Sequence, residues 1–333
     1  MLSPTAAKTK SSNDNFRQDV IAGLQQPQKQ IPCKYLYDKR GSKLFDQICL
    51  LEEYYVSRSE TEIMQCHIGE ITAALGERVR LIEFGSGSSL KTQLLLDHLP
   101  EAVAYIPVDI SENHLLGTAA RLQAHYPHLA VLPVVADFTQ PFALPQVNHA
   151  AQRRPSKPID SQQITTTVYF PGSTIGNYSR EQSTKLLTRI ASLCAEGDGL
   201  LIGVDLQKDK QVLERAYNDA SGITAAFNCN LLRRMQLELG AELDLDGFEH
   251  YAFYNEQQGR IESYLRSRRS QAIQIDDRRF ELSQGELIHT EYSYKYTIDG
   301  FRDDALRAGL SFDNAWTDSR DYFAVLHFIR TGT

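Results

Sequence analysis

The stretch of residues 81–89, Leu-Ile-Glu-Phe-Gly-Ser-Gly-Ser-Ser, restricts the fold of this chain more than any other. An apolar run stops abruptly in a loop of glycine and serine, and a helical pattern over residues 90–99 begins directly behind it. Small residues let the backbone approach a ligand closely, and the start of the helix offers unpaired N–H groups. Because open α/β sheets hold nucleotide-like cofactors at such turns, this stretch predicts an open α/β sheet with a cofactor site at the glycine-rich loop.

Carboxylates end the next two predicted strands. The apolar run at residues 104–108 leads into Asp109, and the run at residues 130–136 leads into Asp137. An acid about 20 residues beyond a glycine-rich loop commonly hydrogen-bonds the hydroxyl groups of a ribose. The loop alone is also compatible with a plain strand-to-helix turn, and the two acids favour a cofactor site over that alternative.

The third position of the loop decides between cofactors. A dinucleotide fingerprint has a third glycine where this chain has Leu90, and that glycine lets a pyrophosphate press against the helix. The substitution disfavours a nicotinamide dehydrogenase. A cofactor with one nucleoside and no phosphate, S-adenosylmethionine, fits the loop Gly85, Ser86 and Gly87 together with the two acid-ended strands.

Composition excludes several classes of partner. The 333 residues carry a formal charge of −7, which argues against a nucleic-acid partner, and the arginines at residues 266–269 and 278–279 have acids nearby. The five cysteines show no C-x-x-C spacing, so neither a disulfide framework nor a metal site is predicted. No run of 18 apolar residues is present, so no membrane span is predicted. A cytoplasmic protein is expected.

The first two thirds of the chain alternate between strand and helix patterns. Residues 1–15 are predicted to be a disordered leader, and residues 140–163 a solvent-exposed insertion. A helix is expected over 59–75, and Ser111 and Ser179 are expected to cap two others. Strands are expected over residues 79–84, 104–108, 130–136, 165–170 and 200–204. Such alternation predicts a parallel sheet.

The pattern changes after Asp205, which indicates a second, mixed domain. Helices are expected over 208–219, 224–239 and 301–308, and strands over 260–266, 272–275, 287–297, 311–316 and 322–329. The last strand is expected to return to the first sheet. The predicted division is a leader at 1–15, substrate-binding segments at 16–57 and 207–296, and cofactor-binding segments at 58–206 and 297–333.

A loop with two glycines follows the fourth predicted strand. Residues 170–178 read Phe-Pro-Gly-Ser-Thr-Ile-Gly-Asn-Tyr, at the sheet edge where open α/β sheets bind ligands. Gly172 lets backbone approach a substrate, and the Asn177 amide oxygen can accept a hydrogen bond from an amine. The alternative for Asn177 is a cap on the following helix.

A late strand and several tyrosines offer further polar groups. Along residues 288–296 the side chains alternate between faces, so Glu291 and Ser293 point the same way and can grip one polar group. A solvent-facing polar side is the alternative. Tyr217, near a predicted helix end, can donate to a carboxylate, although aromatic residues there commonly serve packing.

Ordered motifs over nearly the whole chain resemble one known family. They lie at residues 37–38, 41–42, 44–45, 53–55, 58–60, 85–92, 108–111, 136–138, 170–177, 216–219 and 290–293. From about residue 36 onward the chain resembles the histidine-specific Nα-methyltransferases of ergothioneine biosynthesis. The resemblance implies a Rossmann-like class I methyltransferase sheet and a second, mixed α+β substrate-binding domain. It also implies that S-adenosylmethionine donates three methyl groups to the α-amino nitrogen of free L-histidine, through mono- and dimethyl intermediates, giving hercynine.

The resemblance also implies residue roles by position. Asn177 and Gly172 would hold the α-amino group and serve as the catalytic pair. Glu291 and Ser293, with Tyr54, would engage the imidazole, and Tyr217 would bind the carboxylate. The cofactor site would be lined by Tyr37, Gly85, Ser86, Gly87, Lys91, Asp109, Asp137 and Phe138.

One position departs from the family pattern. Known members carry Met after an Arg-Ile-Glu run, and here Ser263 follows. If Ser263 lines the side-chain pocket, it leaves more room near the ring, so an Nα-methyltransferase for tyrosine or tryptophan is the near alternative. A non-enzymatic S-adenosylmethionine-binding module would leave Asn177, Tyr217 and Glu291 without a joint purpose. A monomer is expected from the family likeness.

Overall fold

The computed structural model describes residues 12–86, 90–147 and 164–332. It divides the chain into two compact units. Unit 1 comprises residues 1–48, 214–254 and 261–291, and unit 2 comprises residues 49–213, 255–260 and 292–333. The functional division expected from the sequence, with boundaries at residues 57, 206 and 296, stays a prediction. Within the described ranges, no helix is long and apolar enough to cross a membrane.

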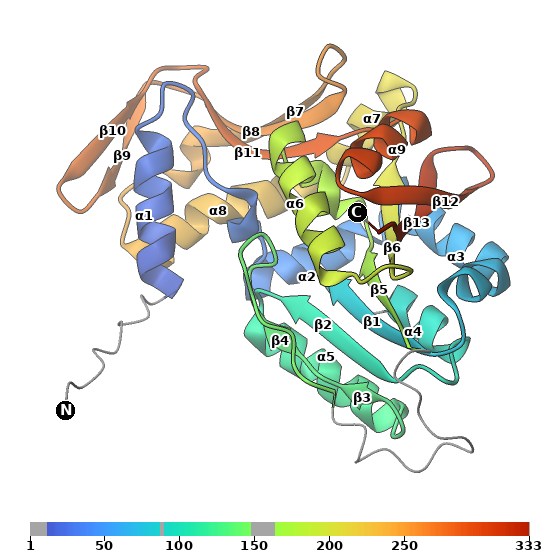
Figure 1. Ribbon diagram of the computed structural model, residues 1–333. Coiled ribbons are helices and arrows are strands. Elements are labelled where there is room, and N and C mark those ends of the chain that lie inside the picture. Colours follow the sequence, from blue (N-terminus) through green and yellow to red (C-terminus); the bar gives the residue numbers. More distant parts are fainter. Residues whose placement is uncertain (1–11, 87–89, 148–163, 333) are drawn as a thin grey trace, which may run out of the picture. The chain divides into compact units, whose positions relative to one another are not determined.

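Unit 2 is built on a sheet to which the described residues contribute eight strands, in the order β12-β13-β6-β5-β1-β2-β3, with β4 also paired to β2 (Figure 1). The parallel strands are β1 (Val79–Phe84), β2 (Ala104–Asp109), β3 (Ala130–Val131), β4 (Val134–Val135), β5 (Thr165–Phe170) and β6 (Gly199–Asp205). β13 (Phe323–Arg330) runs antiparallel to both β6 and β12 (Leu310–Thr317). The prediction that the last strand returns to the first sheet is confirmed.

Helices cover both faces of this sheet. On one face, α6 (Arg180–Leu193) and α9 (Ile298–Arg307) pack on an apolar core that includes Ile82, Val168 and Ile202. On the other face lies α3 (Tyr55–Leu75), because a Cβ added to Gly203 of β6 would lie 2.4 Å from Glu60 Oε1. The unit also contains α4 (Leu90–Asp97), α5 (Glu112–His125), α7 (Lys210–Tyr217, which ends in unit 1) and the 3₁₀ turn η4 (Thr174–Asn177).

Some local predictions for unit 2 are confirmed and others are wrong. Ser179 forms a capping box with Gln182 at the start of α6, as expected. Ser111 holds the N-cap position of α5 but makes no side-chain cap bond to that helix. The expected strand at residues 130–136 is split into β3 and β4, because Pro133 between them has no N–H to donate to a sheet. Most of the predicted insertion lies outside the described residues.

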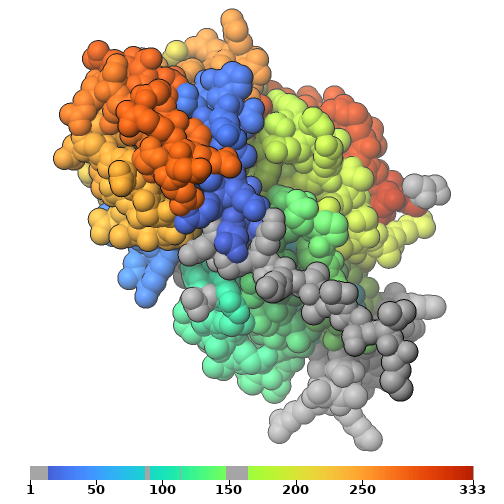
Figure 2. Space-filling model, turned by 90° about the vertical axis from the view of Figure 1, so that its left-hand side faces the viewer, coloured from blue at the N-terminus to red at the C-terminus, as the bar shows by residue number. Residues whose placement is uncertain are grey.

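Unit 1 combines helices with two small sheets. Its helices are α1 (Ser12–Leu24), η1 (Cys33–Leu36), α2 (Lys39–Ile48), α8 (Ile223–Leu239) and η5 (Leu245–Gly247). Among the described residues, β11 (Leu287–Tyr294), β8 (Arg260–Ser267) and β7 (Phe248–Asn255) form one sheet, although residues 255, 260 and 292–294 of these strands are assigned to unit 2. β9 (Gln271–Ile275) and β10 (Arg278–Leu282) form the other. Figure 2 shows α1 in blue against the orange hairpin β9–β10, where Arg17 binds Asp276 at 2.6 Å.

Unit 1 also contains elements that the sequence patterns did not reveal. α1 begins at Ser12, inside the segment predicted as a leader; residues 1–11 lie outside the described part. β7 and β10 were not expected at all. Both strands mix polar and apolar side chains, and β10 alternates between exposed charges and the buried Phe280 and Leu282. Their pairing partners, rather than their composition, make them strands.

Candidate active site

The glycine loop of unit 2 leaves open space beside its backbone. Gly85 follows β1 with φ +72°, and a Cβ placed there would meet no atom of the described residues within 4 Å. Its N–H donates to the carbonyl of Val108 at 2.9 Å, so the loop start is tied to β2. Ser86 is buried. The prediction for Gly87 falls on residues 87–89, which lie outside the described part of the chain.

Two anchored acids follow the neighbouring strands. Asp109 ends β2, and its Oδ1 accepts from the amide of Ser111 at 2.8 Å. Asp137 lies two residues after β4, and its Oδ1 accepts from the amide of Thr139 at 2.9 Å. Each turn fixes one carboxylate oxygen at the carboxyl end of the sheet. Both side chains are partly exposed, so their carboxylates can also meet a ligand.

Phe138 presents an aromatic ring at the same sheet edge. It stacks on Phe84, the last residue of β1, with ring centroids 5.1 Å apart and planes 13° from parallel. Phe170 and Phe142 pack edge-on against Phe84. Two carboxylate acceptors, an aromatic face and an open glycine backbone form a donor and acceptor set that suits an adenosine group.

Glu83 lies beneath the loop as a neutral acid. It is buried on β1 and accepts from Thr92 of α4 at 2.7 Å and from the hydroxyl of Tyr105 on β2. Burial raises the pKa of Glu83 to about 8, against the effect of these hydrogen bonds. The carboxyl is therefore protonated near neutral pH and ties the start of α4 to two strands.

Lys91 is joined to an acid that the sequence analysis left without a role. Its Nζ forms an ion pair with Glu60 of α3, whose side chain is fully buried. Both carboxylate oxygens of Glu60 also accept from the amide of Gly172, at 3.0 Å each. Glu60 therefore links the loop after β5 to α3 and α4, and Gly203 of β6 leaves the space that this carboxylate needs.

The loop after β5 is fixed in an unusual backbone conformation. Gly172 and Ser173 both have positive φ, +76° and +56°, which costs energy for a residue with a side chain. The hydroxyl of Ser173 accepts from the amide of Asp205 at 2.9 Å and stabilises this turn. A Cβ on Gly176 would lie 2.9 Å from the carbonyl oxygen of Tyr294, so glycine is required there. These contacts fix the backbone that carries Asn177.

Tyr54, at the N-cap position of α3, is buried, as is Ser293 on β11. Both residues and Asn177, which ends η4, lie in unit 2. Thus Tyr54, Gly172, Asn177 and Ser293, with Gly85, Ser86, Lys91, Asp109, Asp137 and Phe138, are the predicted residues that the structure brings into one unit.

A buried charge cluster in unit 2 escaped the sequence analysis. Asp205, at the end of β6, binds Lys295 at 2.6 Å and Lys208 at 2.5 Å, and Tyr55 donates to both of its carboxylate oxygens. Burial raises the pKa of Asp205, but the charges of Lys295 and Lys208 outweigh it and lower that pKa below its ordinary value. Burial lowers the pKa of Lys208 to about 8. Lys295 also donates to the Ser293 hydroxyl at 2.8 Å.

In unit 1, Tyr217 is fixed through its backbone. Its carbonyl oxygen lies 2.9 Å from His250 Nε2, and His250 Nδ1 lies 2.9 Å from the amide nitrogen of Asn228. Burial lowers the pKa of His250, against the effect of the Tyr217 bond, so the ring is neutral and these two contacts define its tautomer. Asp219 then accepts from the amides of Ile223 and Thr224 at the start of α8.

Tyr37 and Glu291 also belong to unit 1. Tyr37 follows η1, and its ring packs edge-on against Phe45 of α2 and Phe227 of α8, each at 5.5 Å. Glu291, on β11, is half-buried. Burial of the Cys33 thiol, together with the negative charge of Glu291, raises the pKa of Cys33 to about 12.

Ser263 is buried on β8, and its carbonyl accepts from Thr290 at 3.0 Å. That Ser263 lies beside the imidazole ring of the substrate stays a prediction.

The burial of residues 289–295 argues against a solvent-facing polar side for this strand. A solvent-facing polar side was the competing interpretation for this strand, yet His289, Ser293 and Lys295 are buried and Glu291 is half-buried. The polar face of β11 and the residue after it is therefore an interior surface. Buried polar groups require partners, which is typical of a binding site or a fixed polar network.

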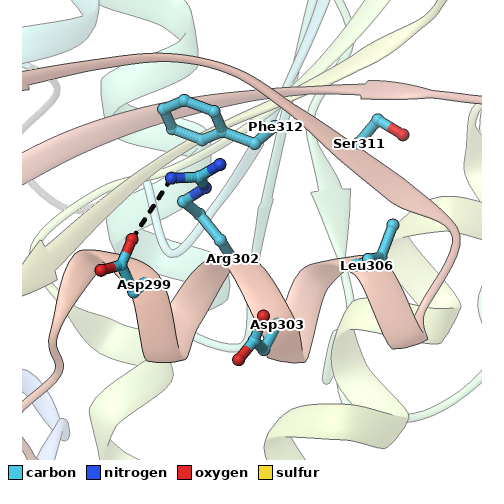
Figure 3. A pocket seen from close by; sticks show the side chains of 6 residues that line it. All are labelled: Asp299, Arg302, Asp303, Leu306, Ser311 and Phe312. Atoms are coloured by element: carbon cyan, nitrogen blue, oxygen red, sulfur yellow. Dashed lines mark hydrogen bonds and ion pairs between the residues drawn. The ribbon is translucent and has the colours of Figure 1, made fainter.

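A pocket of about 400 Å³ elsewhere in unit 2 is not this site. It lies between α9 and β12 and is lined by Asp299, Arg302, Asp303, Leu306, Ser311 and Phe312. Figure 3 shows Arg302 beside the Phe312 ring, with its guanidinium donating a hydrogen bond to Asp299. No residue predicted from the sequence lines it.

The strand order of this sheet, with antiparallel β13 between β6 and β12, and the carboxylates at the end of β2 and after β4 are those of a class I S-adenosylmethionine-dependent methyltransferase. Residues 16–330 match the family described as "Histidine-specific methyltransferase, SAM-dependent". The chain belongs to this family.

Named relatives agree with the family match. The histidine N-alpha-methyltransferase of Mycolicibacterium smegmatis is 38% identical over 325 residues, 96% of each chain. That of Mycobacterium tuberculosis is 36% identical over 315 residues, 93% of each chain. Among solved structures, an S-adenosylmethionine-dependent methyltransferase from Clostridium acetobutylicum has a TM-score of 0.45 at 10% identity, over 82% of this chain and 92% of that one.

Proposed function

We propose that this enzyme transfers three methyl groups in turn to the α-amino nitrogen of free L-histidine and releases hercynine. The family match and the histidine N-alpha-methyltransferase relatives support the acceptor and the position of methylation. The observation that carries the proposal is the loop after β5, in which Glu60 occupies the amide of Gly172. Because that amide is already bound, the loop would present hydrogen-bond acceptors to an amine, namely the carbonyl oxygen of Gly172 and the side-chain oxygen of Asn177.

The residues at the sheet edge fit the cofactor. Asp109 would accept from ribose hydroxyls, Asp137 would accept from the adenine amino group, and Phe138 would face the adenine ring. Gly85 and Ser86 would border the sulfonium side, with Lys91 and Tyr37 as further contacts. When bound, S-adenosylmethionine would supply an electrophilic methyl group. The substrate nitrogen gives one proton to water before each transfer, and the neutral nitrogen then forms a bond to the methyl carbon as the C–S bond breaks and leaves its electron pair on sulfur.

Positioning is the main catalytic contribution of this chain. A methyl transfer needs the neutral amine aligned with the leaving group, and holding reactants in line supplies a large share of a rate enhancement. Gly172 and Asn177 would orient the neutral nitrogen through its two N–H groups in the first transfer and its one N–H group in the second. Before the third transfer they would accept from the single N–H of the dimethylammonium form, which is lost before the nitrogen attacks. Because the loop is tied to α3, α4 and β6, its acceptors stay in place while methyl groups accumulate.

The other groups of histidine would be bound by separate residues. We assign the imidazole to Glu291 and Ser293, with Tyr54, and the carboxylate to Tyr217. An ionised Glu291 makes a charge-assisted hydrogen bond to a ring N–H, which a phenyl ring lacks. A buried polar group left unpaired by the wrong ligand gives large discrimination between substrates.

The test is direct product analysis. The purified chain is incubated with S-adenosylmethionine and each free amino acid, and mass spectrometry counts added methyl groups. Trimethylated histidine as the main product is the expected result. Methylated tyrosine or tryptophan, without methylated histidine, would contradict the proposal and point to the room beside Ser263. Fragmentation that placed the methyl groups on the ring would contradict the Nα assignment.

The setting of the enzyme is part of the same proposal. We assign it to the reducing cytoplasm as a monomer, because its odd number of cysteines shows no paired spacing and its family likeness favours a single chain. Size-exclusion chromatography with light scattering checks the second point, and a stable dimer would contradict it.

A further inference from the structure

Lys295 is a buried cation that the proposed reaction does not use. Its side chain has 0% exposure, and its Nζ lies 2.6 Å from Asp205 Oδ2 and 2.8 Å from Ser293 Oγ. A buried lysine is costly unless it is paired and hydrogen-bonded. Its contact with Ser293 joins the charge cluster at the end of β6 to a residue assigned to the imidazole.

The backbone fixes Lys295 in this position. The amide of Lys295 donates to the carbonyl of Gly259 at 2.8 Å, and the amide of Tyr296 donates to the carbonyl of Asp205 at 2.9 Å. Leu206 and Tyr296 form a parallel bridge, so the segment after β11 lies beside the end of β6. Lys295 and Ser293 share one side of their segment, as residues two apart in an extended chain do.

This contact determines what the Ser293 hydroxyl can do. A serine hydroxyl has one hydrogen to donate and lone pairs to accept with. Because Lys295 can only donate, the Ser293 oxygen accepts from it, and the Ser293 hydrogen points away from the ammonium. The Ser293 hydrogen can therefore be donated to another partner, and the adjacent ammonium charge disfavours a second cationic donor at the remaining lone pair. Glu291, two residues earlier on the same face, can only accept when ionised.

We propose that Lys295 is a positioning residue that makes Ser293 a hydrogen-bond donor, so that the site selects the neutral imidazole of histidine. One ring nitrogen donates to Glu291, and the other, without hydrogen, accepts from Ser293. An imidazolium carries a hydrogen on both nitrogens, so its second N–H would oppose the Ser293 hydrogen and the Lys295 charge. The inference deepens the proposed function and rests on its assignment of Glu291 and Ser293.

Other charged groups surround Lys295. Asp205 of β6 pairs with it, Lys208 and the hydroxyl of Tyr55 share Asp205, and Asp318 acts on Lys208 through its charge. Lys208 is the matched control, because it binds the same carboxylate but lies outside the contact with Ser293 that carries the inference.

The test is ¹⁵N NMR of ring-labelled histidine bound to the full chain, for wild type, Lys295→Met and Lys208→Met. Free histidine has a ring pKa of about 6.5. In wild type and Lys208→Met we expect the bound ring to stay neutral at about pH 5.5, with one protonated and one bare nitrogen, a pKa lowered by at least about one unit. In Lys295→Met we expect the bound ring to titrate at or above its free value, because Glu291 then favours the imidazolium.

Calorimetry gives a second readout. Histidine should bind wild type about tenfold more weakly at pH 5.5 than at pH 7.5, and Lys295→Met by less than about twofold. A bound imidazolium in wild type at pH 5.5 overturns the inference even if Lys295→Met does not fold, as does a folded Lys295→Met with wild-type titration. These results leave the proposed function intact if histidine is still methylated. Absence of histidine binding and methylation in wild type would instead refute the proposed function, and this inference with it.

Discussion

The two units stabilise their buried polar groups in different ways. Unit 2 uses charge clusters, with Glu60 bound to Lys91 and the Gly172 amide, and Asp205 bound to Lys208 and Lys295. Unit 1 relies more on neutral groups and helix ends. His250 is neutral between Asn228 and the Tyr217 carbonyl, and Asp219 accepts from the first amides of α8.

This difference has consequences for mutation. Removing one partner of a buried ion pair leaves an uncompensated charge, whereas removing one neutral hydrogen bond costs about 0.5–1.5 kcal/mol. Variants in the clusters of unit 2 are therefore expected to affect folding and catalysis together. Variants in unit 1 are expected to act on substrate binding or on local stability alone.

The largest effect is expected for Glu60→Ala. It leaves the Gly172 amide and Lys91 without their carboxylate, so we expect unfolding free energy to fall by about 3 kcal/mol or more and kcat/KM by about 100-fold. Urea unfolding and steady-state kinetics measure the two. Glu62→Ala, on the same helix, is the control. Glu62 accepts a solvent-exposed hydrogen bond from the amide of Ser319 and is not part of the contact between Glu60, Lys91 and Gly172. Near-normal activity of a folded Glu60→Ala would show that the loop does not need this anchor.

Glu291→Ala tests the substrate assignment in unit 1. Loss of a charge-assisted hydrogen bond should weaken histidine binding by about 1.5–3 kcal/mol, roughly 10- to 150-fold, and leave S-adenosylmethionine binding unchanged. Calorimetry with each ligand separates the two. Glu281→Ala, an exposed acid on β10, should change neither. Unchanged histidine affinity in Glu291→Ala would refute the assignment.

Asp109→Ala tests the opposite selectivity in unit 2. Loss of one carboxylate contact to the ribose should weaken S-adenosylmethionine binding by about 1.5 kcal/mol, roughly tenfold, with less effect on histidine. Glu112→Ala, at the first turn of α5, is the matched control. An intact cofactor affinity in Asp109→Ala would remove Asp109 from the cofactor site.

Asp219→Ala should have the smallest effect, on stability alone. Burial raises the pKa of Asp219, but bonds from Ser221, Thr224 and Ile223 outweigh it and lower that pKa to about 2. The ionised side chain therefore stabilises the fold above its unfolded pKa of about 3.9, and this stabilisation is lost as pH falls toward 2. Removing this helix-end acceptor should cost about 0.5–2 kcal/mol at neutral pH. Thermal unfolding across pH should show the gap between variant and wild type closing in acid; a gap independent of pH would contradict this role.

The sequence patterns predicted unit 2 better than unit 1. Buried parallel strands are short apolar runs in the sequence, so the local pattern predicted β1, β2, β5 and β6. The acids and glycines at the ends of these runs predicted the edge of the sheet that binds ligands. β7 and β10 of unit 1 were not, because their side chains are mixed and their strand form depends on partners distant in the chain. The split of β3 from β4 could have been anticipated from Pro133.

Within the site, residues in motifs were found and their supports were missed. Gly172 and Asn177 stand out in a loop with two glycines, whereas Glu60 is 112 residues from Gly172, and Asp205 is 90 residues before Lys295. No local spacing signals such pairs. Glu60 stands among the polar and charged residues 58–62, and Lys295 follows β11, so neither residue differs visibly from its neighbours in the sequence.

The sequence by itself determined the class of fold, the cofactor edge and the family, because these depend on short-range patterns of apolar runs, glycines and acids. The tertiary structure alone decided which charges are buried together and how each is paired. Burial removes water from a charged group and makes its partner essential, and that partner is chosen by the fold rather than by proximity in the chain. The roles of Glu60, Asp205 and Lys295 follow from this rule.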